Sequence, residues 1–444
     1  MVRADSHPAS RFVEPDVIRR QFAAAMEDMY RDEVPLYGTL VDIVAGVNQS
    51  MASPPEPEVR HSAVRVGTAA ELHQMARLFA VMGLHPVGYY DLAPAGIPVH
   101  STAFRAITPE SLVACPFRVF TSLLRLELIA DPALRAEAAA ILAGRSIVSA
   151  ETMALIARAE AMGGLTLAEA EEFVAGAVAV FRWHGTARVD AATYQRLLAA
   201  HRLVADVVAF HGPHINHLTP HTHDIDAAQA EMAVRGLPRK ATIEGPPRRQ
   251  VPILLRQTSF NALAEPFVPV GGGGDAAAGL THTARFGEIE QRGAALTPAG
   301  RALYDDCLAR ASEAGASLDE GFAAFPGSFA ELRRQGLAYA RYTARGQHPG
   351  PGPVTLEQAL EQGLILAEPI RYEDFLPVSA AGIFRSNLGS GERASLSASS
   401  ARADLEQALG TAILDPFALY QAIEDTSRAA ALAAVQPTAQ ALPG

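Results

Sequence analysis

Two groups of strand-like segments flank a long helical stretch in this chain, and this order limits the fold more than any other feature. Residues 59–66 are typical of a β-strand, and Thr68-Ala-Ala-Glu71 is a capping box that predicts a helix to about residue 82. Residues 108–210 are rich in Ala, Leu and Arg and predict helices. We therefore expect a small α/β unit followed by a helical insertion. The other strand-like segments cover 85–92, 97–107, 215–219, 251–258 and 280–291, and a last extended stretch covers 365–384.

The supply of reactive side chains narrows the chemistry. The chain has two cysteines, Cys115 and Cys307, and one lysine, Lys240. Two distant cysteines exclude a disulfide scaffold, a four-cysteine zinc site and an iron–sulfur cluster. Lys240 lies in Arg-Lys-Ala, so a P-loop is excluded as well. Any metal site must therefore use histidine and carboxylate ligands.

Charge and hydropathy indicate the surroundings in which the protein works. The formal net charge of −11 argues against binding to nucleic acid or to an anionic membrane. The N-terminus lacks the apolar region of a signal peptide, and no apolar run is long enough to span a bilayer. We expect a cytoplasmic protein without nucleic-acid or membrane partners, and the sequence leaves its oligomeric state open.

A histidine-rich tract is the densest chemical signal. Five histidines lie between residues 211 and 223. Such a tract is a compositional indication of metal binding, although surface loops also carry histidines. A catalytic metal uses about three protein ligands, so we expect one ligand from this tract and leave the other roles open. The five are His211, His214, His217, His221 and His223.

Two of the predicted strands place further polar side chains on one face. His61 and Arg65 share a face of residues 59–66, because side chains alternate along a strand. A metal ligand and a guanidinium placed in this way could bracket a short dicarboxylate. In residues 285–293, Glu288, Glu290 and Arg292 share a face, which either meets solvent or lines a polar cavity. Spacing does not decide between the two glutamates.

Two histidines and one carboxylate from three separate strands match a 2-His-1-carboxylate facial triad. This arrangement leaves coordination positions for a bidentate substrate and O₂, as non-haem Fe(II) oxygenases require. The triad also agrees with the exclusion of cysteine ligands.

Four motifs resemble the 2-oxoadipate dioxygenase/decarboxylase family, also called D-2-hydroxyglutarate synthase. The resemblance extends from about residue 15 to 425 and implies an α+β fold, with a vicinal-oxygen-chelate-like β core that holds the metal. A large helical insertion and flanking helices would decorate this core. The motifs are Arg60-His-Ser-Ala-Val-Arg-Val-Gly-Thr68, His214-Ile-Asn-His-Leu-Thr-Pro220, Arg285-Phe-Gly-Glu-Ile-Glu-Gln-Arg-Gly293 and Phe375-Leu-Pro-Val-Ser-Ala-Ala-Gly-Ile-Phe-Arg-Ser-Asn-Leu388.

The resemblance also implies a ligand set. Fe(II) would be held by His61, His217 and Glu288. Glu288 is favoured over Glu290 because Glu-Ile-Glu-Gln-Arg is similar to the ligand strand of 4-hydroxyphenylpyruvate dioxygenase and hydroxymandelate synthase. In that strand the first glutamate binds iron.

The substrate and reaction implied by the resemblance are equally specific. The enzyme would convert the 2-oxo dicarboxylate 2-oxoadipate and O₂ into (R)-2-hydroxyglutarate and CO₂, a step of lysine catabolism. Arg65 would bind the distal carboxylate, and Arg292 and Arg385 are weaker candidates for contacts. The alternatives are a glyoxalase-like lyase or isomerase that uses another divalent metal, and a non-catalytic 2-oxo acid sensor. The expected substrate-binding residues are His61, Arg65, His217, Val378 and Ser379.

These patterns and the resemblance divide the chain into seven segments. N-terminal helices precede a β core in two parts, which the helical insertion separates. A helical segment, a final core segment that lines the substrate site, and C-terminal helices with a flexible tail follow. The segments are 1–52, 53–107, 108–210, 211–295, 296–360, 361–390 and 391–444.

Overall fold

The computed structural model describes residues 12–51, 59–271, 279–313, 317–347, 352–376 and 401–436. Val378, Ser379 and Arg385 lie outside the described residues. The chain forms two compact units, each assembled from three separate stretches. The first unit consists of Met1–Glu244, Gln257–Glu290 and Phe375–Ile413, and the second of Gly245–Arg256, Gln291–Asp374 and Leu414–Gly444. The seven-segment division stays a prediction.

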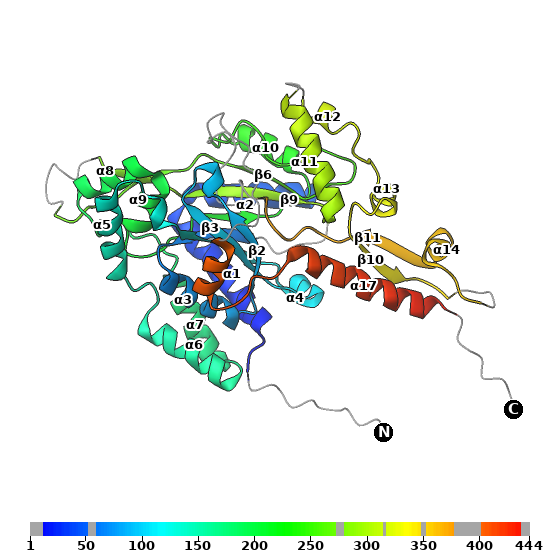
Figure 1. The fold of residues 1–444 in the computed structure, drawn as a ribbon, viewed down its shortest axis with the longest axis horizontal. Helices are drawn as coiled ribbons and strands as arrows, with labels where there is room; N and C mark the ends of the chain where they lie inside the picture. The colour runs from blue at the N-terminus through cyan, green and yellow to red at the C-terminus, as the bar shows by residue number, and fades with distance from the viewer. Residues whose placement is uncertain are drawn as a thin grey trace. The chain divides into compact units, whose positions relative to one another are not determined.

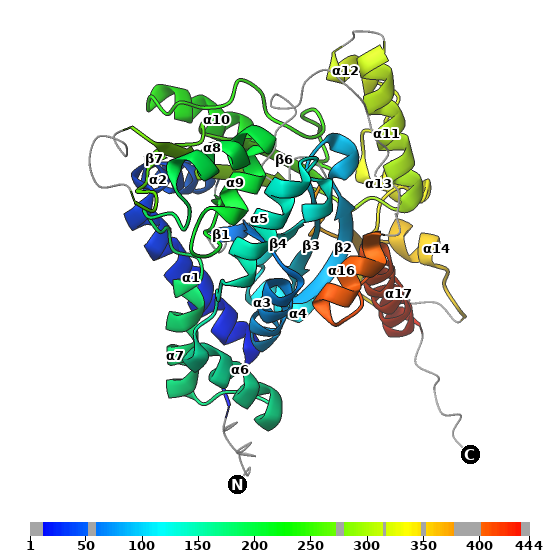
Figure 2. The same ribbon diagram turned by 60° about the vertical axis from the view of Figure 1, so that its left-hand side comes forward.

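In the part of the chain that the structure describes, the largest sheet has seven strands in the order β2-β3-β4-β1-β5-β9-β6. Strand β1 pairs in parallel with β4 and antiparallel with β5, and β5 pairs in parallel with β9. Figure 2 shows the curved ribbon of β1 to β4. The strands are β1 (Val59–Val66), β2 (His85–Asp91), β3 (Val99–Arg105), β4 (Arg118–Leu124), β5 (His217–Pro220), β6 (Leu255–Ser259) and β9 (Phe286–Arg292).

The register of the central strands decides which side chains meet. On β1 and β5, His61 lies opposite Thr219, and Ala63 lies opposite His217. On β5 and β9, Leu218 lies opposite Gly287, so Glu288 follows beside Thr219. Because side chains alternate along strands, His61, His217 and Glu288 share one face of the sheet.

Helices cover the sheet within the first unit. Figure 2 shows α1, α3, α6 and α7 together. Buried phenylalanine rings belong to the core of this unit. Phe22 packs against both Phe117 and Phe181 at centroid distances of 5.9 and 5.7 Å. Two short strands, β7 (Ala264–Pro266) and β8 (Thr281–Thr283), form a separate ribbon. The helices are α1 (Pro15–Glu33), α2 (Pro35–Ser50), α3 (Ala69–Val81), α4 (Pro109–Ala114), α5 (Pro132–Ala143), α6 (Ala150–Met162), α7 (Leu167–Ala179), α8 (Ala191–Ala200), α9 (Arg202–Val208), α10 (Ile225–Val234) and α16 (Ala401–Leu409), with 3₁₀ turns η1 (Ala93–Ala95) and η2 (Leu126–Leu128).

The second unit has its own small core. Helix α17 lies along β10, which pairs antiparallel with β11 (Figure 1). Tyr342, Ile365 and Val435 belong to the buried cluster between them. The elements are α11 (Pro298–Glu313), α12 (Leu318–Gly321), α13 (Phe329–Arg334), β10 (Ala340–Ala344), α14 (Leu356–Glu361), β11 (Ile365–Pro369) and α17 (Pro416–Val435).

The predicted α+β class is confirmed, and so are several elements. The strand at 59–66 is β1, and the Thr68 hydroxyl accepts a hydrogen bond from the Glu71 amide at the start of α3. The helical prediction for 108–210 is wrong at β4, and that for 296–360 is wrong at β10. Every residue of β4 is buried, so it lacks the polar–apolar alternation by which a half-buried strand is identified.

None of the described helices combines the length and the apolar character needed to cross a membrane.

Candidate metal centre

Three strands of the first unit bring His61, His217 and Glu288 together. The residues come from β1, β5 and β9, and their side chains are 1%, 1% and 0% exposed. One ligand atom of each lies within 4.8 Å of the others. His61 Nε2 is 3.0 Å and His217 Nε2 is 3.9 Å from Glu288 Oε1, and the two rings are nearly perpendicular. Two imidazoles and a carboxylate are a donor set that suits a divalent transition metal.

Buried polar atoms without partners support this fit. Among the described residues, neither ring nitrogen of His217 has a hydrogen-bond partner, and Glu288 Oε2 has none. An unpaired buried polar atom costs about 1–3 kcal/mol, so such a group normally implies a bound water or ion. A cation at this point would engage atoms of both residues.

The pKa shifts of His217 and Glu288 are also consistent with a metal site. Burial lowers the pKa of His217 well below its usual value, and the nearby His61 and Arg65 charges lower it further. The imidazole is therefore neutral, as metal coordination requires. Burial raises the pKa of Glu288, and Glu290 adds to this effect while His61 and Gln257 oppose it. A cation would offset the cost of keeping Glu288 ionised.

Neighbouring side chains hold His61 and Glu288 in place. His61 Nδ1 lies 2.6 Å from Glu290 Oε2, so the two glutamates that spacing left undecided contact opposite nitrogens of one imidazole. Gln257 Nε2 donates to Glu288 Oε1 at 2.6 Å, and the Thr219 hydroxyl donates to the same oxygen at 3.2 Å. Sequence reasoning missed Gln257 and Thr219, which lie in strands of ordinary composition. Carboxylates and amides in such positions orient metal ligands.

An aromatic pair covers His61. The Phe375 ring packs edge-on against His61 at 5.0 Å and against Phe120 at 5.2 Å. The Phe375 amide donates to the Tyr90 hydroxyl at 3.3 Å. Phe375 therefore fixes the start of the motif that contains Val378 and Ser379, two residues outside the described part of the chain.

Arg65 meets a second buried cluster. Its Nη1 donates to Asp206 Oδ2 at 2.6 Å. Asp206 also faces His214 and His282, and the three form another group with metal-ligand geometry. Sequence reasoning left the role of His214 open and did not select Asp206 or His282. Asp206 lies in a helical window and His282 in a short strand, so only the fold brings them together.

Other residues selected from the sequence have contacts of their own or are exposed. His211 is exposed. Asn48 of α2 binds the carbonyl oxygen of His221 and the amide of His223, so both residues have a structural contact. Arg292 donates to the carbonyl oxygens of Tyr372 and Asp374.

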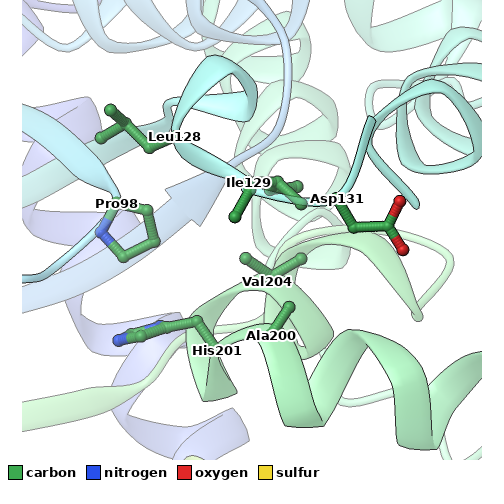
Figure 3. Close-up of a pocket in the computed structure, with 8 residues that line it drawn as sticks. Pro98, Leu128, Ile129, Asp131, Ala200, His201 and Val204 are labelled. Atoms are coloured by element: carbon green, nitrogen blue, oxygen red, sulfur yellow. The ribbon is translucent and has the colours of Figure 1, made fainter. Parts of the chain in front are cut away.

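A pocket of about 250 Å³ does not include the predicted ligands (Figure 3). Apart from Asp131 and His201, its lining is apolar, and Figure 3 shows the Asp131 carboxylate directed away from Ile129. Asp131 caps α5 and His201 caps α9, so both polar side chains have structural roles. The lining residues are Pro98, Leu128, Ile129, Ala130, Asp131, Ala200, His201 and Val204.

Comparison with known proteins gives a consistent result over almost the whole chain. Residues 22–387 match the family model described as 2-oxoadipate dioxygenase/decarboxylase. The Pseudomonas putida protein of that name is 52% identical, covering 98% of this chain and 99% of the relative. The Escherichia coli protein of that name is 50% identical, covering 94% and 98%.

A solved structure agrees with these relatives. The hydroxyglutarate synthase from Pseudomonas putida, in complex with 2-oxoadipate, matches with a TM-score of 0.87 and 51% identity. The match covers 96% of this chain and 99% of that one. The match to the family model and the identity to its named members lead to one conclusion: this chain belongs to the 2-oxoadipate dioxygenase/decarboxylase family.

Proposed function

We propose that this chain is an enzyme that converts 2-oxoadipate and O₂ into (R)-2-hydroxyglutarate and CO₂. The observation that carries the proposal is the buried set His61, His217 and Glu288 in a member of this family. The structure of the Pseudomonas putida relative contains 2-oxoadipate, which supports a 2-oxo dicarboxylate as the substrate.

The proposed cofactor is Fe(II), held by His61, His217 and Glu288. Two histidines and one carboxylate are the protein ligands of non-haem Fe(II) oxygenases, which keep open positions for substrate and O₂. Bound there, Fe(II) would supply the redox chemistry that lets O₂ react with a chelated 2-oxo acid.

The protein's own residues then have defined tasks. Glu290 accepts a hydrogen bond from His61 Nδ1–H, which would leave the Nε2 lone pair, beside Glu288, to bind the metal. Gln257 holds one oxygen of Glu288 and so fixes its direction. Burial of all three ligands excludes bulk water from the reacting groups.

Substrate binding is proposed for the residues around this centre. His61 and His217 would contact the 2-oxo acid end, and Arg65 would bind the distal carboxylate. Arg65 shares a strand face with His61 and is 5% exposed, so its guanidinium lies in a largely desolvated environment. Val378 and Ser379 are proposed as further contacts on the strength of the motif alone.

The proposed reaction balances without another reductant. The C1–C2 bond of 2-oxoadipate breaks and releases C1 as CO₂. C2 gains one oxygen atom and becomes a carboxylate, and the adjacent carbon gains the other as a hydroxyl. Both atoms of O₂ therefore enter one product, and no separate 2-oxo acid is consumed.

Isotope labelling tests this proposal. Iron-loaded protein with 2-oxoadipate and ¹⁸O₂ should give 2-hydroxyglutarate with two ¹⁸O atoms and unlabelled CO₂, and chiral chromatography should identify the (R) product. Glu288→Ala should abolish the product, and Glu160→Ala, at an exposed ion pair with Arg77, should not. Turnover without O₂ would indicate a lyase or isomerase, and binding without CO₂ release would indicate a sensor.

A further inference from the structure

The cluster around Asp206 connects α9 to β1. Asp206 is 5% exposed, and Figure 2 shows α9 next to β1. One of its oxygens, Oδ2, accepts from Arg65 Nη1 at 2.6 Å. The other, Oδ1, lies 2.8 Å from His282 Nε2 and 3.0 Å from His214 Nε2. The His282 contact is a hydrogen bond, and the His214 contact is at ion-pair distance but outside hydrogen-bond geometry.

Aromatic side chains fix both imidazoles. His282 Nδ1 lies 3.0 Å from the Tyr194 hydroxyl, and the Trp183 ring is nearly parallel to His282 at 6.0 Å. Trp183 also packs edge-on against His214 at 4.9 Å, and Phe210 contacts both histidines. Because the rings are confined, the orientation of the Asp206 carboxylate is set by its surroundings.

The charges indicate that Asp206 is an anion held by hydrogen-bond donors. They argue against a second metal site at this cluster. Arg65 is a permanent cation in contact with Asp206, and it would strongly repel a divalent ion at the other carboxylate oxygen in this buried environment. Burial by itself raises the pKa of Asp206, but His214 and Arg65 reverse this effect and hold that pKa well below its usual value. Asp206 is therefore ionised and balances the charge of Arg65.

The two oxygens of Asp206 contact different partners, and this restricts how Asp206 pairs with Arg65. Since Oδ1 is directed to the histidines, Asp206 contacts Arg65 through Oδ2 and one Nη rather than through a two-pronged pair. A carboxylate that could rotate would be able to form a bidentate pair with the guanidinium, with two parallel N–H···O bonds. The histidines thus limit Asp206 to one hydrogen bond with the Arg65 guanidinium.

We infer that Asp206 is a positioning residue that holds the Arg65 guanidinium in the orientation needed for the distal carboxylate of the substrate. His214 and His282 act through it by fixing Oδ1. The inference rests on the proposed function, in which Arg65 binds that carboxylate. It assigns a role to His214 and adds Asp206 and His282 to the residues that determine substrate affinity.

A double-mutant cycle tests the inference. Asp206→Asn, Arg65→Gln and the double variant are compared with wild type as iron-loaded full-length protein. Asp206→Asn should raise the KM for 2-oxoadipate by about tenfold, a shift of the size expected for groups in contact. It should leave kcat and the iron content near those of wild type. In the Arg65→Gln background it should have little further effect on KM.

Tyr194→Phe is a milder second variant that keeps the test valid if Asp206→Asn does not fold. It removes the hydroxyl beside His282 and should raise KM in the same direction by a smaller factor, again only when Arg65 is present. Tyr339→Phe in the second unit is a comparable loss of a tyrosine hydroxyl, which donates to the carbonyl oxygen of Phe417, and it should leave KM unchanged.

Three results would overturn the inference: an unchanged KM in Asp206→Asn, additive effects of the two substitutions, or two metal ions per wild-type chain with one lost in His214→Ala. The coupling is also measured in the free energy of unfolding, which requires no turnover. If wild type consumes no O₂ with 2-oxoadipate, the proposed function fails. If the losses of unfolding free energy in the two single variants add up to the loss in the double variant, this inference fails. The two failures are therefore distinguishable.

Discussion

The imidazole of His61 lies between two buried carboxylates, with Nδ1 2.6 Å from Glu290 Oε2 and Nε2 3.0 Å from Glu288 Oε1. The two glutamates are two residues apart on β9 and share a face of the sheet. They nevertheless have different surroundings, because Gln257 and Thr219 contact Glu288 and not Glu290 in the hydrogen bonds described above. In the proposed site, Glu288 would therefore bind the metal and Glu290 would orient His61.

Glu290→Gln is expected to weaken metal binding by about 10- to 100-fold, because His61 loses the charged acceptor that fixes its tautomer. The affinity is measured by competition with a chelator. Glu160→Gln changes an exposed glutamate in the same way and should keep wild-type affinity. Unchanged affinity in Glu290→Gln would mean that this contact does not tune the site.

Glu288→Ala is expected to remove both the bound metal and the activity, since it deletes one of the three proposed ligand side chains. Metal content after dialysis and O₂ uptake with 2-oxoadipate are the measurements. A Glu288→Ala protein that keeps metal, alongside a Glu290→Ala protein that loses it, would show that the ligand was assigned to the wrong glutamate.

Phe375→Ala is expected to cost about 3 kcal/mol of stability, because it empties a fully buried ring site between His61 and Phe120. It should also raise the KM for 2-oxoadipate, since the ring anchors the start of the predicted substrate motif. Chemical denaturation gives the first quantity and steady-state kinetics the second. Phe322→Ala, a similarly buried ring in the second unit, should lose stability without a change in KM.

The stability difference between wild type and Asp206→Asn should depend on pH. Burial raises the pKa of Asp206, but His214 and Arg65 outweigh burial and lower this pKa below its value in the unfolded chain. A carboxyl with a lowered folded-state pKa stabilises the protein above its unfolded pKa of about 3.9 and loses that contribution as pH falls toward the folded pKa.

We expect the free energy of unfolding of wild type to exceed that of Asp206→Asn by on the order of 3 kcal/mol above about pH 5. This difference should decrease below about pH 4. Urea denaturation across this range measures it. The same difference at every pH would indicate that the Asp206 charge does not contribute.

Local sequence signals were sufficient for some of the fold. The Thr68 cap and the strand before it depend on neighbouring residues, and both are present as predicted. Strand β4 was missed because it is buried on both faces, and such a strand has no periodic signal that separates it from a buried helix. Strand β10 was missed within a segment whose other signals predicted helices.

The candidate site shows the same division between local and tertiary information. The shared faces of β1 and β9 follow from alternation, so His61, Arg65, Glu288 and Glu290 could be selected from the sequence. Which glutamate is proposed to bind the metal depends on the strand that lies beside each, and this requires the sheet order. Asp206 could not be selected, because its partners come from residues 65, 214 and 282 and meet only in the folded chain.

The most direct test of the central claim measures O₂ uptake and CO₂ release together, on protein reconstituted with Fe(II) and supplied with 2-oxoadipate as the only 2-oxo acid. The account predicts one O₂ consumed and one CO₂ released for each 2-oxoadipate converted to 2-hydroxyglutarate, with no turnover in anaerobic buffer or after metal removal. Conversion of 2-oxoadipate without O₂ uptake, or full activity in metal-free protein, would contradict it.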